Sequence, residues 1–172
     1  LAEWSAEISA VTLNEEFKET DRFTVARADA VTFDLGEGPG PLLDAADERS
    51  GDVFGAMSDL FANELAYDSL LEDHLVTRGL YIEYLLVPEQ LRGYRWGSCA
   101  LANLLSALEL ESTLVLCHLP MAGNEFQEPA AKTIKSFGAQ RFASTETFWW
   151  HTEQRAQEAT IEAHLAGPLG GR

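Results

Sequence analysis

The turn between residues 88 and 98 holds the side chains whose types and spacing could do chemistry. It contains Arg92, Gly93, Arg95 and Gly97, and the apolar run before it holds a single carboxylate, Glu83. Arginine donates charge-assisted hydrogen bonds to phosphate oxygens, and glycine lets backbone amides come close to such a ligand. The pattern therefore indicates an anion site, although a plain solvated turn can have the same composition.

The elements on either side of this turn must position it. Residues 80–87 are apolar except for one glutamate, which is typical of an interior strand. Four leucines at helical spacing then predict an α-helix capped by Gly97 or Ser98: Leu101, Leu104, Leu105 and Leu108. Because residues 112–120 form another apolar run, we expect two parallel strands with a right-handed crossover. The unpaired first amides of the helix would face the turn and attract an anion.

In this order, the segment resembles the GNAT superfamily of acyl-CoA N-acyltransferases. The family signature follows a strand that ends in V-x-P-E, and it reads Arg or Gln, two residues, Gly, one residue, then Gly or Ala. The stretch at 87–97 reads VPEQLRGYRWG, in which Arg92 and Gly97 match the first and last positions. Arg95 stands at the middle glycine.

A second family pattern, a helix ending in Tyr-x-x-x-Gly-Phe, is kept only in part. Gly138 matches, but Ile134 stands where the tyrosine would be and Ala139 where the phenylalanine would be. The resemblance covers about residues 79–150, and residues 1–78 match no GNAT motif. In many GNAT proteins that tyrosine protonates the departing thiolate, so the resemblance implies slow turnover rather than none.

The resemblance implies an α/β (α+β) fold in a single domain spanning residues 1–172. The sheet would be mixed, mostly antiparallel and twisted, with one parallel strand pair splayed around the cofactor and helices on both faces. The implied function is an N-acetyltransferase that moves an acetyl group from acetyl-CoA to a primary amine of a small molecule or peptide. The alternatives are a CoA-binding module without turnover and an acidic protein-interaction domain. A homodimer is one option for the oligomeric state.

The resemblance also assigns the residues that would contact acetyl-CoA. Backbone groups at the strand end would hold the pantetheine arm and polarise the thioester carbonyl, at Leu85, Leu86 and Val87. The turn and the first helical residues would take the pyrophosphate, at Arg92, Gly93, Tyr94, Arg95, Trp96, Gly97 and Ser98.

Two side chains near the predicted cleft are candidate catalytic groups. Glu83 is the only ionisable side chain inside the central strand, and burial there would suit it to act as a general base. A glutamate paired with an arginine is an equal alternative. His118 ends the second parallel strand, and a hydrogen-bonded structural histidine is its alternative interpretation. The scattered histidines and cysteines have no metal-ligand spacing, so we predict no metal site.

Charge and composition exclude several classes of function. The 172 residues include 28 acidic and 12 basic ones, for a net charge of −16, whereas nucleic-acid-binding proteins present a basic surface. Anionic membrane surfaces are disfavoured for the same reason, and no apolar run approaches the ~20 residues that span a bilayer. The N-terminus lacks the pattern of a signal peptide, and Cys99 and Cys117 fit buried reduced thiols. We therefore expect a cytoplasmic protein.

The acidic excess is concentrated between residues 29 and 73. It includes Asp44, Asp47, Glu48, Asp52, Asp59, Glu64, Asp68, Glu72 and Asp73. An acidic rim of this kind would steer a cationic amine acceptor toward the site. A highly charged surface that keeps the protein soluble explains the same excess.

The remaining segments complete the expected fold. Two antiparallel strands are predicted at 5–13 and 22–35, a loop at 36–41, and a helix at 52–65 whose pattern extends to 75. A helix from Pro129 to Gly138 would be followed by closing strands at 140–143 and 147–151. The aromatic residues 148–150 are expected in the core, with a dimer surface or a pocket wall as alternatives. Residues 152–172 are predicted to form a polar helix and a flexible tail.

Overall fold

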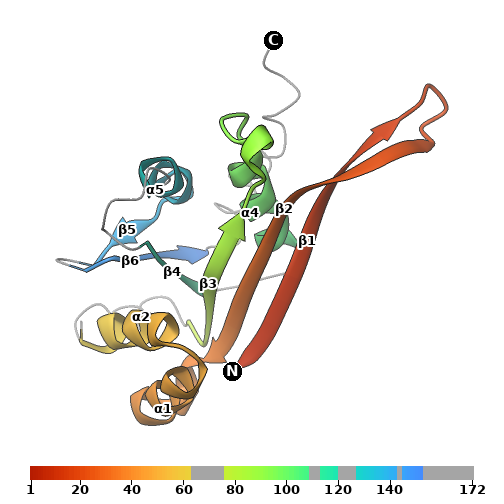
Figure 1. Ribbon diagram of the computed structural model, residues 1–172. Coiled ribbons are helices and arrows are strands. Elements are labelled where there is room, and N and C mark those ends of the chain that lie inside the picture. Colours follow the sequence, from red (N-terminus) through yellow and green to blue (C-terminus); the bar gives the residue numbers. More distant parts are fainter. Residues whose placement is uncertain (63–75, 109–112, 120–126, 143–144, 153–172) are drawn as a thin grey trace.

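The computed structural model describes residues 1–62, 76–108, 113–119, 127–142 and 145–152. Six strands form one sheet in the order β1-β2-β3-β4-β6-β5 (Figure 1). Their bounds are β1 Ala2–Leu13, β2 Glu19–Asp34, β3 Arg78–Leu86, β4 Thr113–His118, β5 Gln140–Arg141 and β6 Thr147–Thr152. Only β3 and β4 pair in parallel, and every other neighbouring pair is antiparallel. The predicted mixed sheet with one parallel strand pair is confirmed.

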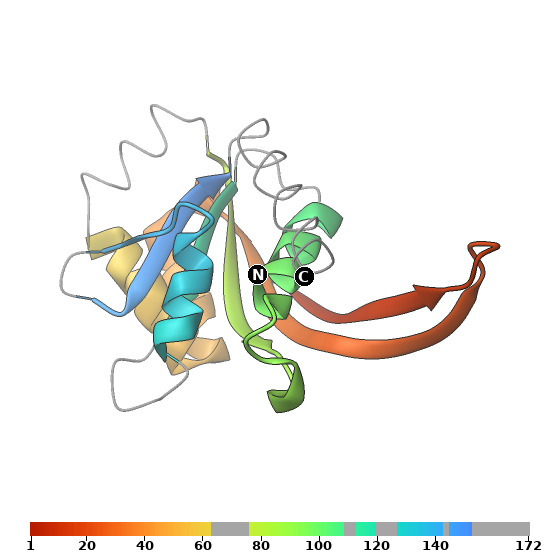
Figure 2. The ribbon, with the colours of Figure 1, turned by 90° about the horizontal axis from the view of Figure 1, so that it is seen from above.

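Strands β1 and β2 form a long hairpin whose far end projects from the rest of the molecule (Figures 1 and 2). The predicted strands at 5–13 and 22–35 are confirmed in kind, although β1 begins earlier, at Ala2, and β2 runs from Glu19 to Asp34. The Asn14 side chain closes that turn by accepting hydrogen bonds from the amides of Glu16 and Lys18, each at 3.0 Å. Asparagine side chains commonly satisfy turn amides in this way, which explains why the connection is so short.

The predicted loop at 36–41 is partly wrong, because a helix begins inside it. The strands do end there, and a short 3-10 turn, η1 (Leu35–Glu37), follows. Helix α1 (Pro39–Arg49) then starts with Pro39 and Pro41 in its first turn. Proline is well accommodated at this end of a helix, since the first amides have no intrahelical partner to lose. Glycine and proline at 36–41 therefore mark a helix start as well as a strand end.

The helices cover both faces of the sheet. Helices α1 and α2 (Gly51–Ala62) pack with Leu42, Met57 and Leu60 against Leu114 and Leu116 on one face. The opposite face of the same strand is covered by α4 (Trp96–Ala107) and α5 (Gln127–Lys135). Adjacent β4 residues therefore point to opposite faces and are buried on both, which explains why the sequence of that strand shows no polar alternation.

The closing segment follows its prediction. The chain leaves α5 through Gly138, whose φ of 87° is the left-handed conformation that glycine adopts without strain. Phe148 and Trp150 are buried on the α4–α5 face, and Trp149 stacks on Phe142 at 5.7 Å on the other face, so the core assignment of these aromatics is confirmed. Thr152, which we expected in the C-terminal helix, belongs to β6.

Several expectations lie outside the described residues. They are residues 63–75 of the predicted helix, the two ends of the predicted strand 112–120 at residues 112 and 120, residue 143 of the predicted strand 140–143 with residue 144 of its turn, and the C-terminal helix and tail after Thr152. Residue 119 is described, and it follows β4 outside the strand. None of the helices in the described ranges is long and apolar enough to cross a membrane.

One glycine of β3 allows a close aromatic contact and generates a stability prediction. Gly79 pairs with Phe33 of β2, and an added Cβ would meet the Phe33 ring at 1.9 Å. Because Phe33 is itself only 4% exposed, the ring has no room to retreat. Gly79→Ala should lower the free energy of unfolding by about 1–3 kcal/mol or more in a urea titration.

The matched control is Gly55→Ala in α2, where nothing lies within 4 Å of the added Cβ. Alanine is the better helix former, so this variant should gain about 0.5–1 kcal/mol. Equal stability of the two variants would contradict the proposed packing of Phe33 on Gly79.

Candidate functional site

The candidate site begins where the parallel strand pair ends. Register pairs run from Arg78 and Thr113 to Ile82 and Cys117, and β4 stops one residue later at His118. Strand β3 continues to Leu86, paired with β2 alone (Figure 1). On its other edge, the last residues of β3 therefore have no strand partner within the described part of the chain. Their backbone groups are available to an extended ligand, as in strand addition to a sheet edge.

A β-bulge at Glu83 changes the direction of the side chains at this end of β3. Asp29 of β2 pairs with Tyr84 and Ala30 pairs with Ile82, so Glu83 is the extra residue. A one-residue insertion reverses the side-chain alternation beyond it. Leu85 consequently packs on the α4–α5 face together with Ile82.

The turn after β3 is held by its own arginine. Arg92 Nε donates a hydrogen bond to the Val87 carbonyl at 3.1 Å, which ties the turn back to the strand end. Gly93 has a φ of 82° and Arg95 a φ of 65°, so both residues lie in the left-handed region. Arg95 therefore keeps the conformation that a glycine would adopt most easily at this position.

Arg95 is the N-cap of α4, so the predicted caps Gly97 and Ser98 are wrong. Both residues lie in the first turn instead, because helical backbone starts directly after the left-handed residue. The first intrahelical bond is from the Cys99 amide to the Arg95 carbonyl at 3.1 Å, and no side chain caps the helix. The amides of residues 96–98 thus lie at the positive end of the helix dipole, which is the geometry that holds phosphate.

The side chains around these amides differ in what they contact. Tyr94 is 68% exposed, whereas Trp96 packs edge-on against Phe23 of the hairpin at 6.3 Å. An ideal Cβ on Gly97 would lie 3.8 Å from Val87 and 4.0 Å from the Thr133 hydroxyl. The turn, the end of β3 and helix α5 therefore meet around Gly97. Thr133 is a candidate anion ligand that the sequence did not suggest, because no motif places α5 beside α4.

Glu83 is paired with an arginine, as one of its two interpretations expected. Arg49 Nε and Nη2 donate to the two carboxylate oxygens at 3.0 and 2.6 Å, and Nη1 contacts Glu3 of β1. Hydrogen bonding to Glu83 raises the pKa of Arg49. The identity of the partner was not predicted, because Arg49 ends a helix that was itself not predicted.

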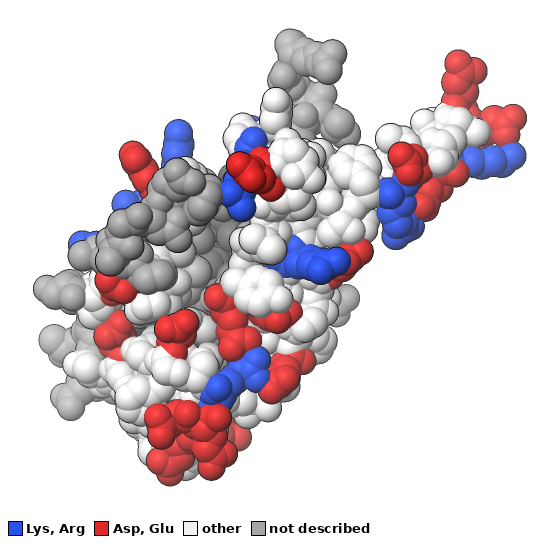
Figure 3. Space-filling model, in the orientation of Figure 1, with Lys and Arg blue, Asp and Glu red and all other residues white. Residues whose placement is uncertain are grey.

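The sheet surface beside this ion pair carries further polar groups. Hydrogen bonds from Ser5 and then Tyr84 lower the pKa of Asp29, and the bond to Asp29 raises the pKa of Tyr84. Figure 3 shows acidic side chains gathered over α1, where Asp44, Asp47 and Glu48 lie. Within the predicted acidic segment, Glu64, Asp68, Glu72 and Asp73 lie outside the described residues.

His118 belongs to a chain of polar contacts on the α1–α2 face. Its Nδ1 lies 3.4 Å from the Thr147 hydroxyl, and that hydroxyl donates to Asp59 of α2 at 2.5 Å. On its other side, His118 Nε2 lies 3.3 Å from the Glu146 carboxylate. None of these three partners was singled out for this role from sequence, because they come from separate elements of the fold.

The fold brings Glu83 and His118 to corresponding positions. Each is the first residue after the last parallel register pair, Ile82 with Cys117, one on β3 and one on β4. Both contact helices of the same layer, Glu83 through Arg49 of α1 and His118 through Thr147 to Asp59 of α2. The two candidate catalytic groups therefore flank the point where the strands separate.

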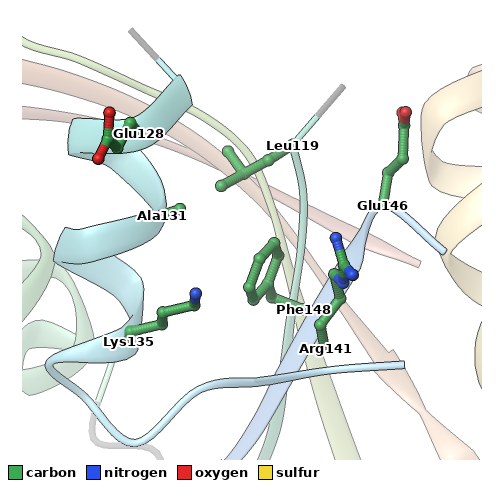
Figure 4. A pocket seen from close by; sticks show the side chains of 7 residues that line it. All are labelled: Leu119, Glu128, Ala131, Lys135, Arg141, Glu146 and Phe148. Atoms are coloured by element: carbon green, nitrogen blue, oxygen red, sulfur yellow. The ribbon is translucent and has the colours of Figure 1, made fainter. Parts of the chain in front are cut away.

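A cavity of about 240 Å³ lies beside this point, between α5 and the closing strands (Figure 4). Its lining is Leu119, Glu128, Ala131, Lys135, Arg141, Glu146 and Phe148. Lys135 Nζ lies 5.9 Å from the Phe148 ring centroid, a cation–π distance. Glu146 lines the cavity and also contacts His118, so the cavity adjoins the polar chain.

Neither cysteine is suited to act as a nucleophile. Burial raises the pKa of Cys117 to about 12 and also raises the pKa of Cys99. Only the thiolate attacks a thioester, so these thiols are unreactive at neutral pH. Ile134 is 6% exposed within the core of the α4–α5 face, so α5 offers no proton donor at that position.

The left-handed N-cap residue can be tested by stability. In urea titrations, the free energy of unfolding of Arg95→Gly should exceed that of Arg95→Ala by about 1 kcal/mol. Glycine adopts the left-handed conformation without the steric cost that alanine keeps. Both variants lose the same side chain, so the difference isolates the backbone. A less stable glycine variant would show that residue 95 is not left-handed in solution.

Comparison with known proteins gives structural likeness only. No protein-family model and no curated protein sequence matches the chain. Solved structures that resemble it include an apo mutant of agmatine N-acetyltransferase, with 19% identity over 75% of this chain and 70% of that one, and a TM-score of 0.44. Another is a Drosophila melanogaster polyamine N-acetyltransferase, with 20% identity, 84% and 74% coverage and a TM-score of 0.44.

A mosquito arylalkylamine N-acetyltransferase-like protein has 12% identity, the same 84% and 74% coverage and a TM-score of 0.44. Scores at this level carry no argument about the chemistry of this chain. In the chain itself, the one parallel pairing ends before a turn that enters an uncapped helix. This arrangement agrees with the mixed sheet and single parallel strand pair that we predicted from the sequence.

Proposed function

We propose that this chain is an N-acetyltransferase that uses acetyl-CoA to acetylate a primary amine of a small molecule or peptide. The observation that carries the proposal is the end of the parallel ladder at Ile82 and Cys117, beyond which β3 alone continues into the turn before α4. A strand edge without a partner and an uncapped helix start are then joined by one short turn. An extended thioester arm with a diphosphate at its end fits that combination.

The groups at this site have the hydrogen-bonding chemistry that CoA requires. The amides of residues 96–98 would hold the pyrophosphate, with Arg92, Arg95 and the Thr133 hydroxyl beside them. The β3 edge at Leu85 and Leu86, with the backbone of Val87 just beyond the strand, would pair with the amide groups of the pantetheine arm. Arg92 already binds the Val87 carbonyl through Nε, so it would link the strand end and the phosphate site.

The chemistry asks little of the protein beyond positioning and one proton acceptor. The ammonium first gives up one proton, and the amine nitrogen then attacks the thioester carbonyl carbon. The C–N bond forms, the C–S bond breaks to release the thiolate, and the second N–H proton passes to solvent or to the thiolate. Glu83 and His118 flank the end of the parallel pairing, where they can accept the first proton. The thiolate can depart without an acid because its reference pKa is ~8.5, so Ile134 slows the reaction without forbidding it.

A cationic acceptor is favoured by the charges on the α1–α2 face. Glu3, Glu7, Asp29 and Glu83 lie there, and the two arginines paired with them, Arg27 and Arg49, offset half of their charge. Such a surface raises the local concentration of amines that carry positive charge.

The second candidate function, a CoA-binding module without turnover, is favoured by Ile134, which stands where the family pattern has a tyrosine.

The test is acetyl-CoA binding followed by turnover. Binding to the native state should raise the melting temperature, because ligand at 100 times Kd adds about 2.7 kcal/mol. With a panel of mono- and polyamines, release of CoA thiol should exceed the rate without amine. Binding without amine-dependent release would establish the module, and the absence of both heat and melting shift at millimolar acetyl-CoA would reject either function.

The two arginines should contribute unequally to CoA affinity. Arg92→Ala should weaken binding by about 1.5–3 kcal/mol, since it removes a charge-assisted contact and the tie to Val87. Arg95→Ala should cost less, because residue 95 contributes mainly its backbone conformation. Isothermal titration of both variants checks this, and a larger loss at Arg95 would mean that the exposed guanidinium is the main phosphate ligand.

A further inference from the structure

The polar contacts of His118 indicate which ring nitrogen carries the hydrogen in the neutral imidazole. A hydroxyl has one proton to donate, and the Thr147 hydroxyl donates it to Asp59 at 2.5 Å. The same oxygen lies 3.4 Å from His118 Nδ1. The hydroxyl can therefore only accept from the ring, so Nδ1 must carry the hydrogen. In the neutral imidazole, Nε2 then keeps its lone pair.

That lone pair faces a carboxylate. His118 Nε2 lies 3.3 Å from Glu146 Oε2, so the imidazolium donates to this carboxylate, whereas in the neutral ring both atoms are acceptors. An ammonium group that approaches the neutral pair can donate one N–H to each atom, and Glu146 then stabilises the imidazolium that forms when Nε2 takes a proton. With the side chain of His118 20% exposed and that of Glu146 34% exposed, the pair can meet a ligand from solvent.

We propose that His118 Nε2, and not Glu83, accepts the proton of the acceptor ammonium, and that Asp59 and Thr147 are positioning residues which fix the required tautomer. This inference rests on the proposed acetyl transfer. The ammonium transfers one proton to Nε2, and the neutral amine nitrogen forms the C–N bond. The C–S bond breaks to release the thiolate, and the second N–H proton passes to that thiolate, which leaves as the CoA thiol. The imidazolium then returns its proton to solvent.

Glu83 is unsuited to this role because of its partner. Both of its carboxylate oxygens accept hydrogen bonds from Arg49, at 3.0 and 2.6 Å. The charged groups that contact His118 or its hydroxyl partner are Asp59 of α2 and Glu146 before β6, and Glu83 stands at the corresponding register position of β3. Of these, Glu83 is neutralised by Arg49, while Asp59 acts through Thr147 and Glu146 contacts Nε2 directly.

The first test reads the tautomer without any assay of turnover. Nitrogen NMR of the full chain labelled in histidine distinguishes the two ring nitrogens, and His118→Gln assigns the signal among the four histidines. In the parent above the titration range, His118 should be the Nδ1–H form alone. Thr147→Val and Asp59→Ala should each yield a mixture of tautomers, whereas Thr147→Ser should keep the parental form.

Thr152→Val is the matched control for loss of a threonine hydroxyl on β6. Thr152 is buried and its hydroxyl donates to the Thr113 carbonyl at 3.0 Å, far along the strand from His118. It should lower stability without altering the His118 tautomer. The positioning role of Thr147 and Asp59 would be overturned if the parent protein contained a mixture of His118 tautomers. It would also be overturned if Thr147→Val kept the Nδ1–H form alone.

The second test is the pH profile of acetyl transfer. His118→Gln should lower kcat about 100-fold or more, the usual contribution of a general base, and should abolish the acid limb of kcat/KM. Thr147→Val and Asp59→Ala should lower kcat about 10-fold or more while KM for acetyl-CoA stays unchanged, and Thr147→Ser should restore it. An acid limb that survives in His118→Gln, or that disappears in Glu83→Gln instead, would overturn the assignment of the base.

The two proposals fail in different ways. If the parent has the Nδ1–H tautomer but releases no CoA with any amine, the acetyl transfer and the catalytic role are rejected, while the positioning by Asp59 and Thr147 stands. If the parent releases CoA but the tautomer is mixed, the function stands and the inference fails.

Discussion

Parallel strands β3 and β4 pair only as far as Ile82 and Cys117, because β4 ends while β3 continues along β2. In a sheet interior, a strand edge without a partner would leave buried backbone groups unsatisfied, and such groups cost free energy. Here the edge opens at the sheet end, where a ligand can satisfy it. The turn, the uncapped helix and the two candidate catalytic side chains all take their positions from this one separation.

The bulge at Glu83 converts the separation into a site with two chemically different sides. Beyond it, Leu85 packs on the α4–α5 face, while Glu83 and Tyr84 contact polar groups of the opposite layer. The Arg49–Glu83 pair adds little net stability, because desolvation offsets much of its attraction, but removing one partner would leave a half-buried charge uncompensated. Its physical effect is to fix the α1 terminus against the sheet at the point where the strands part.

Features set by residues close together in the sequence could be predicted, whereas features set by tertiary contacts could not. The apolar runs and the leucine spacing predicted β3, α4 and β4, and the turn composition predicted an anion site before α4, because these are local patterns. Helix α1 was missed because its two prolines resemble a loop. The bulge was missed because an apolar strand shows no alternation from which a register shift could be detected. Arg49, Asp59 and Thr147 were missed because only the tertiary fold brings them to β3 and β4.

The two departures from the GNAT signature have different physical consequences. At residue 95, the backbone keeps the left-handed conformation, so an arginine replaces the glycine at a cost of roughly 1–2 kcal/mol and leaves the direction of the helix amides intact. At residue 134, the side chain is buried in the core, so the chemical group itself is lost and no change of conformation restores it. In the proposed acetyl transfer, a site without a proton donor at residue 134 depends on the other proton transfer, from the acceptor amine. The polar chain through His118 is the group that we propose for that transfer.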